Sequence, residues 1–308
     1  MAQQSGALSR LLLSYETAYG ANPSPTAAKV VPIISHTLGR KRGVVQPDVI
    51  DGYRGASKPV YGLQDISGDI TVPVELGNLG YWLRAAFGQT SSPYGDASAT
   101  AQPSLVLEDQ ASSPAKYFRY NGMMVRSLGF DFGPGANYQC RVGVVGKVMA
   151  PAGTSYDAAP TAAITKVPIA YNHLALSIAG APVTYFTRFS LDVDLGIVTE
   201  THAISGGGKE TQVLAGRIGC SGNLEALLSA TDLATWESGE TEVEIELVAT
   251  VAVSQTLTIT MPTCLIHTAE NPLPGPGGRM ISGQYTAYDN TRDGVLGRQV
   301  QFALANGS

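Results

Sequence analysis

The sequence predicts a mainly β protein made of two tandem β-sandwich or barrel-like domains, each with a short flanking α-helix. Apolar residues alternate with polar ones over most of the chain, helical patterns are few and short, and one order of elements occurs twice. The 308 residues suit two domains of ordinary size better than one. We therefore expect a first domain at residues 1–155 and a second at residues 156–308.

The first half carries the clearest element signals. Strands are expected over residues 28–38 and 65–76, where apolar side chains alternate with polar ones. Residues 79–87 predict a helix, because their apolar side chains share one face and Gly88 follows as a natural stop. A hairpin is expected over residues 117–149, turning at a Gly-Pro-Gly sequence.

The second half follows a predicted linker at residues 150–163 and repeats the order of elements. Its expected strands lie at residues 189–195, 211–221, 241–253, 255–267, 280–288 and 295–304. A second helix is expected at Asn223–Trp236, where leucines give one apolar side. The halves share a Gly-x-Ile sequence at Gly68 and Gly216, an offset of 216 − 68 = 148 residues. Duplication explains this repeat, and independent sandwich design is the alternative.

Composition limits the function classes. Only 15% of the residues are charged, against about 25% in a typical soluble domain. Such a surface suits a protein that packs against copies of itself, although a neutral secreted β protein would look similar. The net charge is −5 and the only basic run is Arg40–Arg42, so tight nucleic-acid binding is not expected. The polar start and the short Leu11–Leu13 run predict a soluble protein without a signal peptide.

Sequence patterns for chemistry are missing, so we expect no enzyme activity, no cofactor and no metal. The three cysteines are far apart without a C-x-x-C pair, which favours neither zinc nor disulfides and fits a reducing compartment. No two of the four histidines have the i, i+4 spacing of a metal pair on a helix. Glu210 follows Lys209 where a phosphate-binding loop needs Ser or Thr.

Acidic residues form two rows at alternate positions of two predicted strands. One row is Glu242, Glu244 and Glu246, and the other is Asp192 and Asp194. Alternate residues face the same side of a strand, so each row is a line of carboxylates rather than the pair across a cleft that glycoside hydrolysis uses. A solvated face and an acidic wall along a channel both remain open.

Four segments follow one another in an order that spans most of the chain. The first runs from Ser9 to Ile33 and contains Glu-Thr-x-Tyr-Gly at Glu16–Gly20. A strand, turn and short helix follow at Tyr61–Gly88, and a hairpin follows at Tyr117–Gly146. The sequence LTITMPTCLI, then PLPGPGG and a closing strand, completes the order. Because the order spans nearly the whole chain, the protein resembles a major tail tube protein of long-tailed, siphovirus-type phages.

This resemblance implies a structural subunit of the virion, made in the cytoplasm of the bacterial host. Its copies would form rings whose inner sheets join into one barrel around a lumen, and the rings would stack into a tube that conducts double-stranded DNA without binding it specifically. The implied partners are the chain itself, the tape measure protein, the tail terminator and distal tail proteins. Two tube domains per chain predict a trimeric ring with pseudo-sixfold symmetry, and a hexamer with one elaborated domain per chain is the alternative.

Within the resemblance, two sets of residues become site candidates. Both acidic rows are candidates for facing the lumen, because repulsion from phosphate would keep DNA mobile. Ring stacking is assigned to the corresponding loops Gly39–Gly62 and Val198–Glu210. The stacking candidates are Pro47, Asp48, Val49, Asp51, Tyr53, Arg54, Lys58, Gly206, Gly207, Gly208 and Lys209.

Two other classes of protein are carried as alternatives. One is another self-assembling virion or surface protein, such as a secreted filament or layer subunit. The other is a carbohydrate-active enzyme on a double sandwich, which would need paired carboxylates and aromatic platforms. Trp82 and Trp236 both fall in predicted helices, which argues against such platforms.

Overall fold

A computed structural model of the chain describes most of its residues and bears out the mainly β prediction. The described residues are 6–23, 27–48, 50, 52, 55–96, 101–112, 115–135, 138–165, 167–183, 185–198, 214–227, 241–270, 280–289 and 299–306. Within them there is one α-helix, α1 (Leu79–Phe87), and the short 3-10 helices η1 (Gly6–Leu8) and η2 (Tyr171–His173).

The strands come in two runs separated by η2. The first run is β1 (Arg10–Tyr15), β2 (Lys29–Val31), β3 (Ser35–His36), β4 (Gly39–Val45), β5 (Val60–Pro73), β6 (Tyr94–Gly95), β7 (Leu105–Ser112), β8 (Ala115–Phe132), β9 (Gln139–Gly146) and β10 (Val148–Ala152). The second run is β11 (Leu174–Ile178), β12 (Ala181–Pro182), β13 (Phe186–Asp194), β14 (Ile197–Val198), β15 (Leu214–Ala215), β16 (Gly219–Leu227), β17 (Val243–Ala252), β18 (Gln255–Glu270), β19 (Met280–Ala287) and β20 (Gln301–Asn306).

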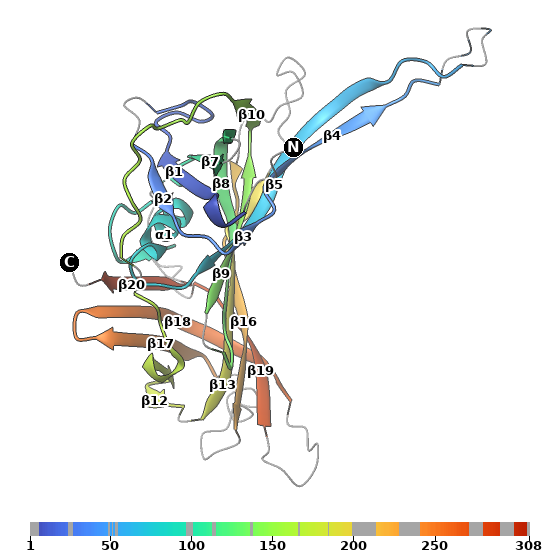
Figure 1. Cartoon of the computed structure of the whole chain (residues 1–308). Coiled ribbons are helices and arrows are strands. Elements are labelled where there is room, and N and C mark those ends of the chain that lie inside the picture. Colours follow the sequence, from blue (N-terminus) through green and yellow to red (C-terminus); the bar gives the residue numbers. More distant parts are fainter. Residues whose placement is uncertain are drawn as a thin grey trace.

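One antiparallel central sheet runs through both halves of the chain. Its strand order is β4–β5–β9–β8–β13–β16–β19–β18. The long strands β8 and β18 change sheets along their length, because their first parts pair instead with β7 and β10 and with β17 and β20. Figure 1 shows β9, β16 and β13 nearly edge-on, with α1 and both side sheets on one side of them.

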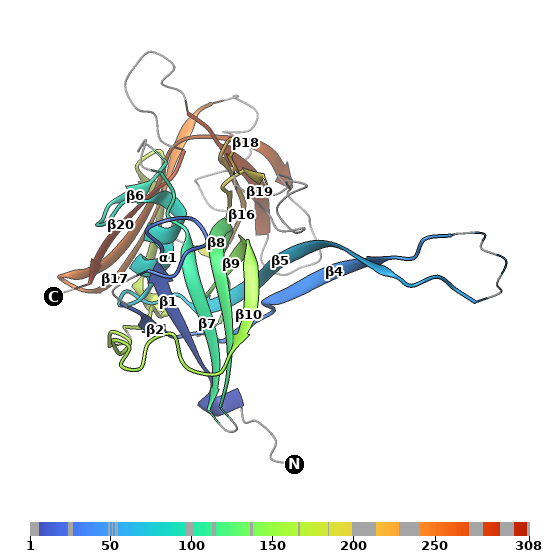
Figure 2. The same cartoon turned by 90° about the horizontal axis from the view of Figure 1, so that it is seen from above.

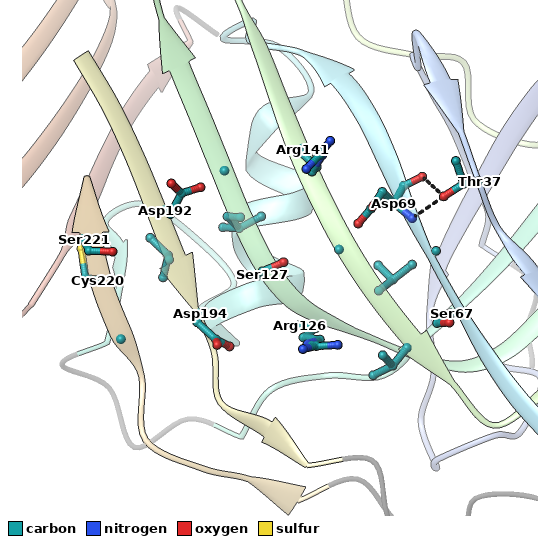
Figure 3. Close-up of a pocket in the computed structure, with 18 of the residues that line it drawn as sticks. Thr37, Ser67, Asp69, Arg126, Ser127, Arg141, Asp192, Asp194, Cys220 and Ser221 are labelled. Carbon is teal, nitrogen blue, oxygen red and sulfur yellow. Dashed lines mark hydrogen bonds between the residues drawn. The ribbon is translucent and has the colours of Figure 1, made fainter. Parts of the chain in front are cut away.

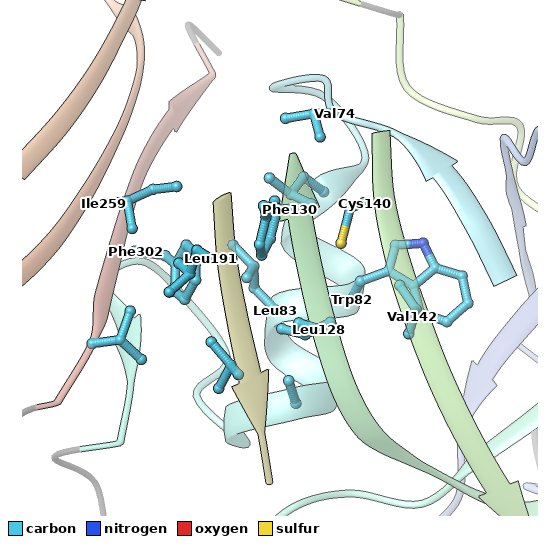
Figure 4. Packing of buried hydrophobic residues seen from close by; sticks show 14 of the residues in the cluster. Val74, Trp82, Leu83, Leu128, Phe130, Cys140, Val142, Leu191, Ile259 and Phe302 are labelled. Atoms are coloured by element: carbon cyan, nitrogen blue, oxygen red, sulfur yellow. The ribbon is translucent and has the colours of Figure 1, made fainter. Parts of the chain in front are cut away.

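Period-2 alternation explains which face of the central sheet is covered. In β13 the side chains of Phe189, Leu191 and Val193 are buried, while Asp192 and Asp194, which alternate with them, are exposed. The buried face packs against α1 and the side sheets. In Figure 4, Leu191 and Phe130 lie in this core together with Trp82 and Leu83 of α1 and Phe302 of β20.

The helix predicted at residues 79–87 is confirmed with the same bounds. Its apolar side, including Leu79, Trp82 and Leu83, is buried in the core. The helix ends at Gly88, whose φ of 82° lies in the left-handed region and whose N–H donates to the carbonyl of Arg84. Glycine adopts this conformation without steric cost, which is why the helix stops there.

The order of strand pairing repeats between the two halves of the chain. The first half contains the ladders β1–β7, β7–β8, β8–β10, β8–β9, β9–β5 and β5–β4. The second half contains β11–β17, β17–β18, β18–β20, β18–β19, β19–β16 and β16–β13. Each of these six ladders of the first half therefore has a counterpart in the second half, although both halves share one sheet and one core.

The prediction of a second helix at Asn223–Trp236 was wrong for its first residues. Residues 223–227 belong to strand β16, which pairs with β13 on one edge and β19 on the other. The leucines suggested a helical face, but Leu224 and Ala226 are buried and alternate with Asn223 and Glu225. Two paired neighbours therefore outweigh the local pattern. Residues 228–236, including Trp236, lie outside the described residues.

Other expected boundaries shift less. The first part of the predicted linker at residues 150–163 continues strand β10, which pairs with β8. The predicted strand at residues 28–38 is divided into β2 and β3, which join different sheets. The expected strand at residues 211–221 is broken, because 214–215 pair with β14 and β16 starts only at Gly219.

Candidate functional site

The face of the central sheet that points away from the core is open and polar. A hollow of about 970 Å³ lies over it and is lined by strands from both halves of the chain. Glycine and serine are common in the lining: Gly39, Ser67, Gly68, Ser127, Gly129, Gly143, Gly219 and Ser221. Figure 3 shows Ser127, Asp192 and Ser221 on successive strands of this face. We call this surface the open face.

Opposite charges are spread over the open face in balance. Its hollow is lined by the cations Lys41, Arg126 and Arg141 and by the anions Asp69, Asp192 and Asp194. Three against three gives no net charge. The expectation of a purely acidic wall therefore does not describe this surface, because the arginines come from β8 and β9 whereas the row of aspartates lies on β13.

The position of Asp192 shows how glycines create this arrangement. Gly129 pairs with Arg141 on one side and with Asp192 on the other, so it stands between the two charged side chains. A Cβ at Gly129 would lie 2.9 Å from Oδ1 of Asp192. Burial raises the pKa of Asp192, and the nearby Arg141 guanidinium opposes this rise. The glycine thus lets a carboxylate and a guanidinium share a crowded face.

A charge pair marks the far end of this face. The guanidinium of Arg188 donates to both carboxylate oxygens of Asp131, from Nε at 2.9 Å and from Nη2 at 2.7 Å. Both side chains are about half exposed, so solvent screens the pair. We expect it to contribute about 0.2–1 kcal/mol at most.

The glutamate row lies elsewhere than the aspartate row. Glu244 and Glu246 belong to β17 of a side sheet, where they alternate with buried Val243 and Ile245. Glu242 precedes β17 and accepts a hydrogen bond from the hydroxyl of Tyr288. That bond raises the pKa of Tyr288 to about 12. The structure therefore brings Asp192 and Asp194 into the hollow and leaves the glutamates outside its lining.

A long two-stranded arm projects from the edge of the central sheet. It consists of β4 and the first part of β5, and Figures 1 and 2 show it reaching far from the rest of the protein. Val44 pairs with Tyr61 and Val45 pairs with Val60, and these four side chains are 59–69% exposed. An isolated hairpin is marginally stable, and large exposed apolar side chains mark an interaction surface. The arm therefore carries an exposed apolar surface of the kind that marks a contact with another molecule.

The stacking candidates fall in and around this arm. Pro47, Asp48 and Lys58 lie in its described outer part, between β4 and β5. Val49, Asp51, Tyr53, Arg54, Gly206, Gly207, Gly208 and Lys209 lie outside the described residues. The segment that holds the four last-named candidates starts and ends at the short ladder β14–β15. It connects β13 to β16, as residues 46–59 connect β4 to β5.

The Glu-Thr-x-Tyr-Gly motif has a structural explanation. The carboxylate of Glu16 accepts hydrogen bonds from the N–H of Gly20 at 2.7 Å, the hydroxyl of Ser104 at 2.6 Å and the N–H of Gly122 at 2.8 Å. Gly122 has a φ of 68° and lies where β8 passes from the side sheet into the central sheet. Glu16 therefore fixes the bend of the strand that connects two sheets.

The described residues show few features of a reactive centre. No group of three or more His, Cys, Asp or Glu among them could hold a metal ion. All three cysteines are free and buried, and burial raises the pKa of each thiol, to about 12 for Cys264. Of the helices in the described part of the chain, none is both long and apolar enough to cross a membrane.

The polar open face and the exposed apolar arm define a class of protein: a β-rich structural subunit with surfaces suited to contacts with other molecules. The family model for phage tail tube proteins matches residues 6–288 of the chain. The chain therefore belongs to the phage tail tube protein family, a structural component of the virion tail. No curated protein matches the chain.

Proposed function

We propose that copies of this chain close into rings that stack into the hollow tail tube of a long-tailed phage, through which DNA passes from capsid to host. The observation that carries the proposal is the open face, which runs without interruption across both halves of the chain. A tube wall needs a sheet that is covered on one side only, and the central sheet is covered on its core side by α1 and the side sheets.

The chemistry of the open face supports its role as the lumen wall. Tight binding of DNA needs clustered Lys and Arg that displace counterions. On the open face the three cations of the hollow are matched by three carboxylates, so a DNA duplex would meet small polar groups and no net positive charge. Asp192 and Asp194 are the lumen residues of this proposal. Glu242, Glu244 and Glu246 stay a prediction, because they lie outside the hollow.

The repeated pairing supports three chains per ring. If residues 1–155 and 156–308 each contribute one related tube unit, three chains supply six units in a closed ring. A ring of six chains is the alternative. Tubes also need a contact along their axis, and the exposed apolar arm is the candidate for stacking one ring on the next.

Further partners follow from a tube of this kind. We infer that tape measure protein fills it during assembly and that terminator and distal tail proteins close its two ends. The subunit would be made in the host cytoplasm before it enters the virion.

Electron microscopy of the purified protein at high concentration tests the proposal. We expect tubes or rings with an open lumen, and a top view gives the number of chains per ring. Deletion of residues 49–58 is expected to leave rings and remove long tubes. A protein that stays monomeric even when mixed with purified tail tip complexes would reject the proposal.

A charge reversal tests which surface faces DNA. In phage that carry the variant subunit, Asp192→Lys should leave tube assembly intact and slow DNA ejection, because it makes the open face basic. Glu246→Lys makes the same charge change on the other acidic row. Slow ejection with Glu246→Lys alone would place the lumen on the outer side of β17 instead.

A further inference from the structure

The chain contains, between its own two halves, a template for the contact that joins neighbouring copies. In the central sheet, each half supplies four strands in the same order: β4–β5–β9–β8 and then β13–β16–β19–β18. The halves are joined by the ladder between β8 and β13. At the two ends of the sheet, the counterparts of these joining strands, β18 and β4, have no described strand on their outer edges at residues 265–270 and 39–45.

A bulge in each long strand fixes the correspondence residue by residue. In β8 the register shifts at Arg126, and in β18 it shifts at His267. Val125, just before the first bulge, pairs with the buried Val144, which pairs in turn with Gly68. Ile266, just before the second bulge, pairs with the buried Tyr285, which pairs in turn with Gly222. Gly222 therefore corresponds to Gly68, at an offset of 222 − 68 = 154 residues, and Ile266 corresponds to Val125, at an offset of 266 − 125 = 141 residues. The Gly-x-Ile match at Gly216 is not part of this correspondence.

Exposure shows that the outer edge of β18 lacks its cover. Met124 and Leu265 occupy equivalent places, two residues before each bulge. Met124 is 7% exposed, in the strand that the second half of the chain pairs with from Arg126 onward, whereas Leu265 is 37% exposed. The same strand position is thus covered inside the chain and uncovered at its end.

We propose that the β18 edge at residues 265–270 pairs with the β4 edge of a second copy, in the register in which β8 pairs with β13. This inference rests on the proposed ring. Within the chain, Ser127 lies opposite Asp194. Ser127 follows its bulge directly, as Thr268 does. Asp194 corresponds to Lys41, because Asp194 pairs with the residue three positions before Gly222 and Lys41 pairs with the residue three positions before Gly68. The contact therefore sets Thr268 of one copy opposite Lys41 of the next.

The chemistry of the edges fits a contact that forms only in the assembly. Unpaired strand edges offer a full row of N–H and C=O groups, and pairing two such edges extends a sheet. Arg40 stands where the counterpart strand has the buried Val193, and it donates to the carbonyl of Met149 at 3.4 Å. A charge at this position discourages irregular edge pairing by free subunits. Because the two edges differ, the contact is heterologous and can close a ring.

Cysteine cross-linking in assembled tubes tests the register. The variant with Lys41→Cys and Thr268→Cys should give covalent oligomers with a short bismaleimide, while the native cysteines stay unreactive because they are buried. The matched control pairs Lys41→Cys with Leu265→Cys, three residues along the same edge, and should cross-link at least tenfold less. The largest circular product counts the chains in a ring.

Hydrogen exchange of the unmodified protein gives a second readout that needs no variant. On assembly, amides at residues 39–45 and 265–270 should become protected together. Tubes that form with neither cross-links nor protection at these edges would overturn the inference and leave the proposed function intact. Cross-linking only in the control pair would also overturn it. Absence of any ring from the unmodified protein, with or without tail tip complexes, would instead count against the proposed function.

Discussion

Replacement of Glu108 by glutamine should destabilise the protein strongly. The side chain of Glu108 is fully buried in β7 and its carboxylate is surrounded by donors. Arg119 donates from Nε and Nη2 at 2.9 Å, the N–H of Tyr156 donates at 2.8 and 3.0 Å, and Gln110 donates at 2.6 Å. These bonds attach the start of the segment that connects the two halves to a side sheet.

Glu108→Gln keeps the shape of the side chain but removes its charge and turns one acceptor into a donor. Arg119 then loses its buried counter-charge, and at least one N–H faces another donor. Breaking a buried pair in this way costs about 3–5 kcal/mol of unfolding free energy. Urea unfolding at pH 7, followed by tryptophan fluorescence, measures the loss.

Asp131→Asn is the matched control, because it breaks an arginine–carboxylate pair that is about half exposed. We expect that variant to cost only about 0.2–1 kcal/mol. Equal losses for the two variants would refute the reasoning, since burial would then not determine the strength of the interaction.

Two further predictions follow from buried backbone and buried thiols. A Cβ at Gly222 would contact the carbonyl oxygen of Ser190 and lie 2.5 Å from the hydroxyl of Tyr285. Gly222→Ala should therefore lower the free energy of unfolding by about 1–3 kcal/mol, as measured by thermal unfolding. Gly219→Ala on the same strand is the control and should be nearly neutral, because a Cβ there meets nothing within 4 Å. Burial raises the pKa of the Cys264 thiol to about 12 and also raises the pKa of Cys140 and Cys220. A thiol reagent at pH 8 should therefore label none of the three in the folded protein and all three in denaturant. Fast labelling of the folded protein would contradict their burial.

Local patterns predicted those elements that local physics determines. The helix at residues 79–87 has a one-sided apolar face and a glycine stop, and both signals are contained within ten residues. The alternating strand at Phe189–Leu195 likewise needs no knowledge of its partners. In contrast, Leu224 and Leu227 fit a helix as well as a strand, and only the neighbours β13 and β19 decide between them.

The candidate site could be predicted only in part, because it depends on pairing between distant strands. The aspartate row was visible in one strand. Arg141, which precedes Asp192 by 192 − 141 = 51 positions in the sequence, lies next to it only because β8 with Gly129 pairs with both of their strands. The sequence match between Gly68 and Gly216 has an offset that the strand pairing does not share. The true repeat lies in the order of the ladders, which tolerates substitutions that erase sequence similarity.

For the proposed ring, the size of the barrel that the central sheets would form favours three chains over six. Each chain contributes eight strands to the central sheet, so three chains give 3 × 8 = 24 strands and six give 6 × 8 = 48. With strands about 4.8 Å apart and tilted by about 40°, 24 strands close at a diameter of about 50 Å and 48 at about 95 Å. Side chains of the open face would narrow the smaller barrel to a lumen that still admits one double helix. The larger barrel would leave DNA far from any wall, and the small residues and balanced charges of the open face would then have nothing to act on.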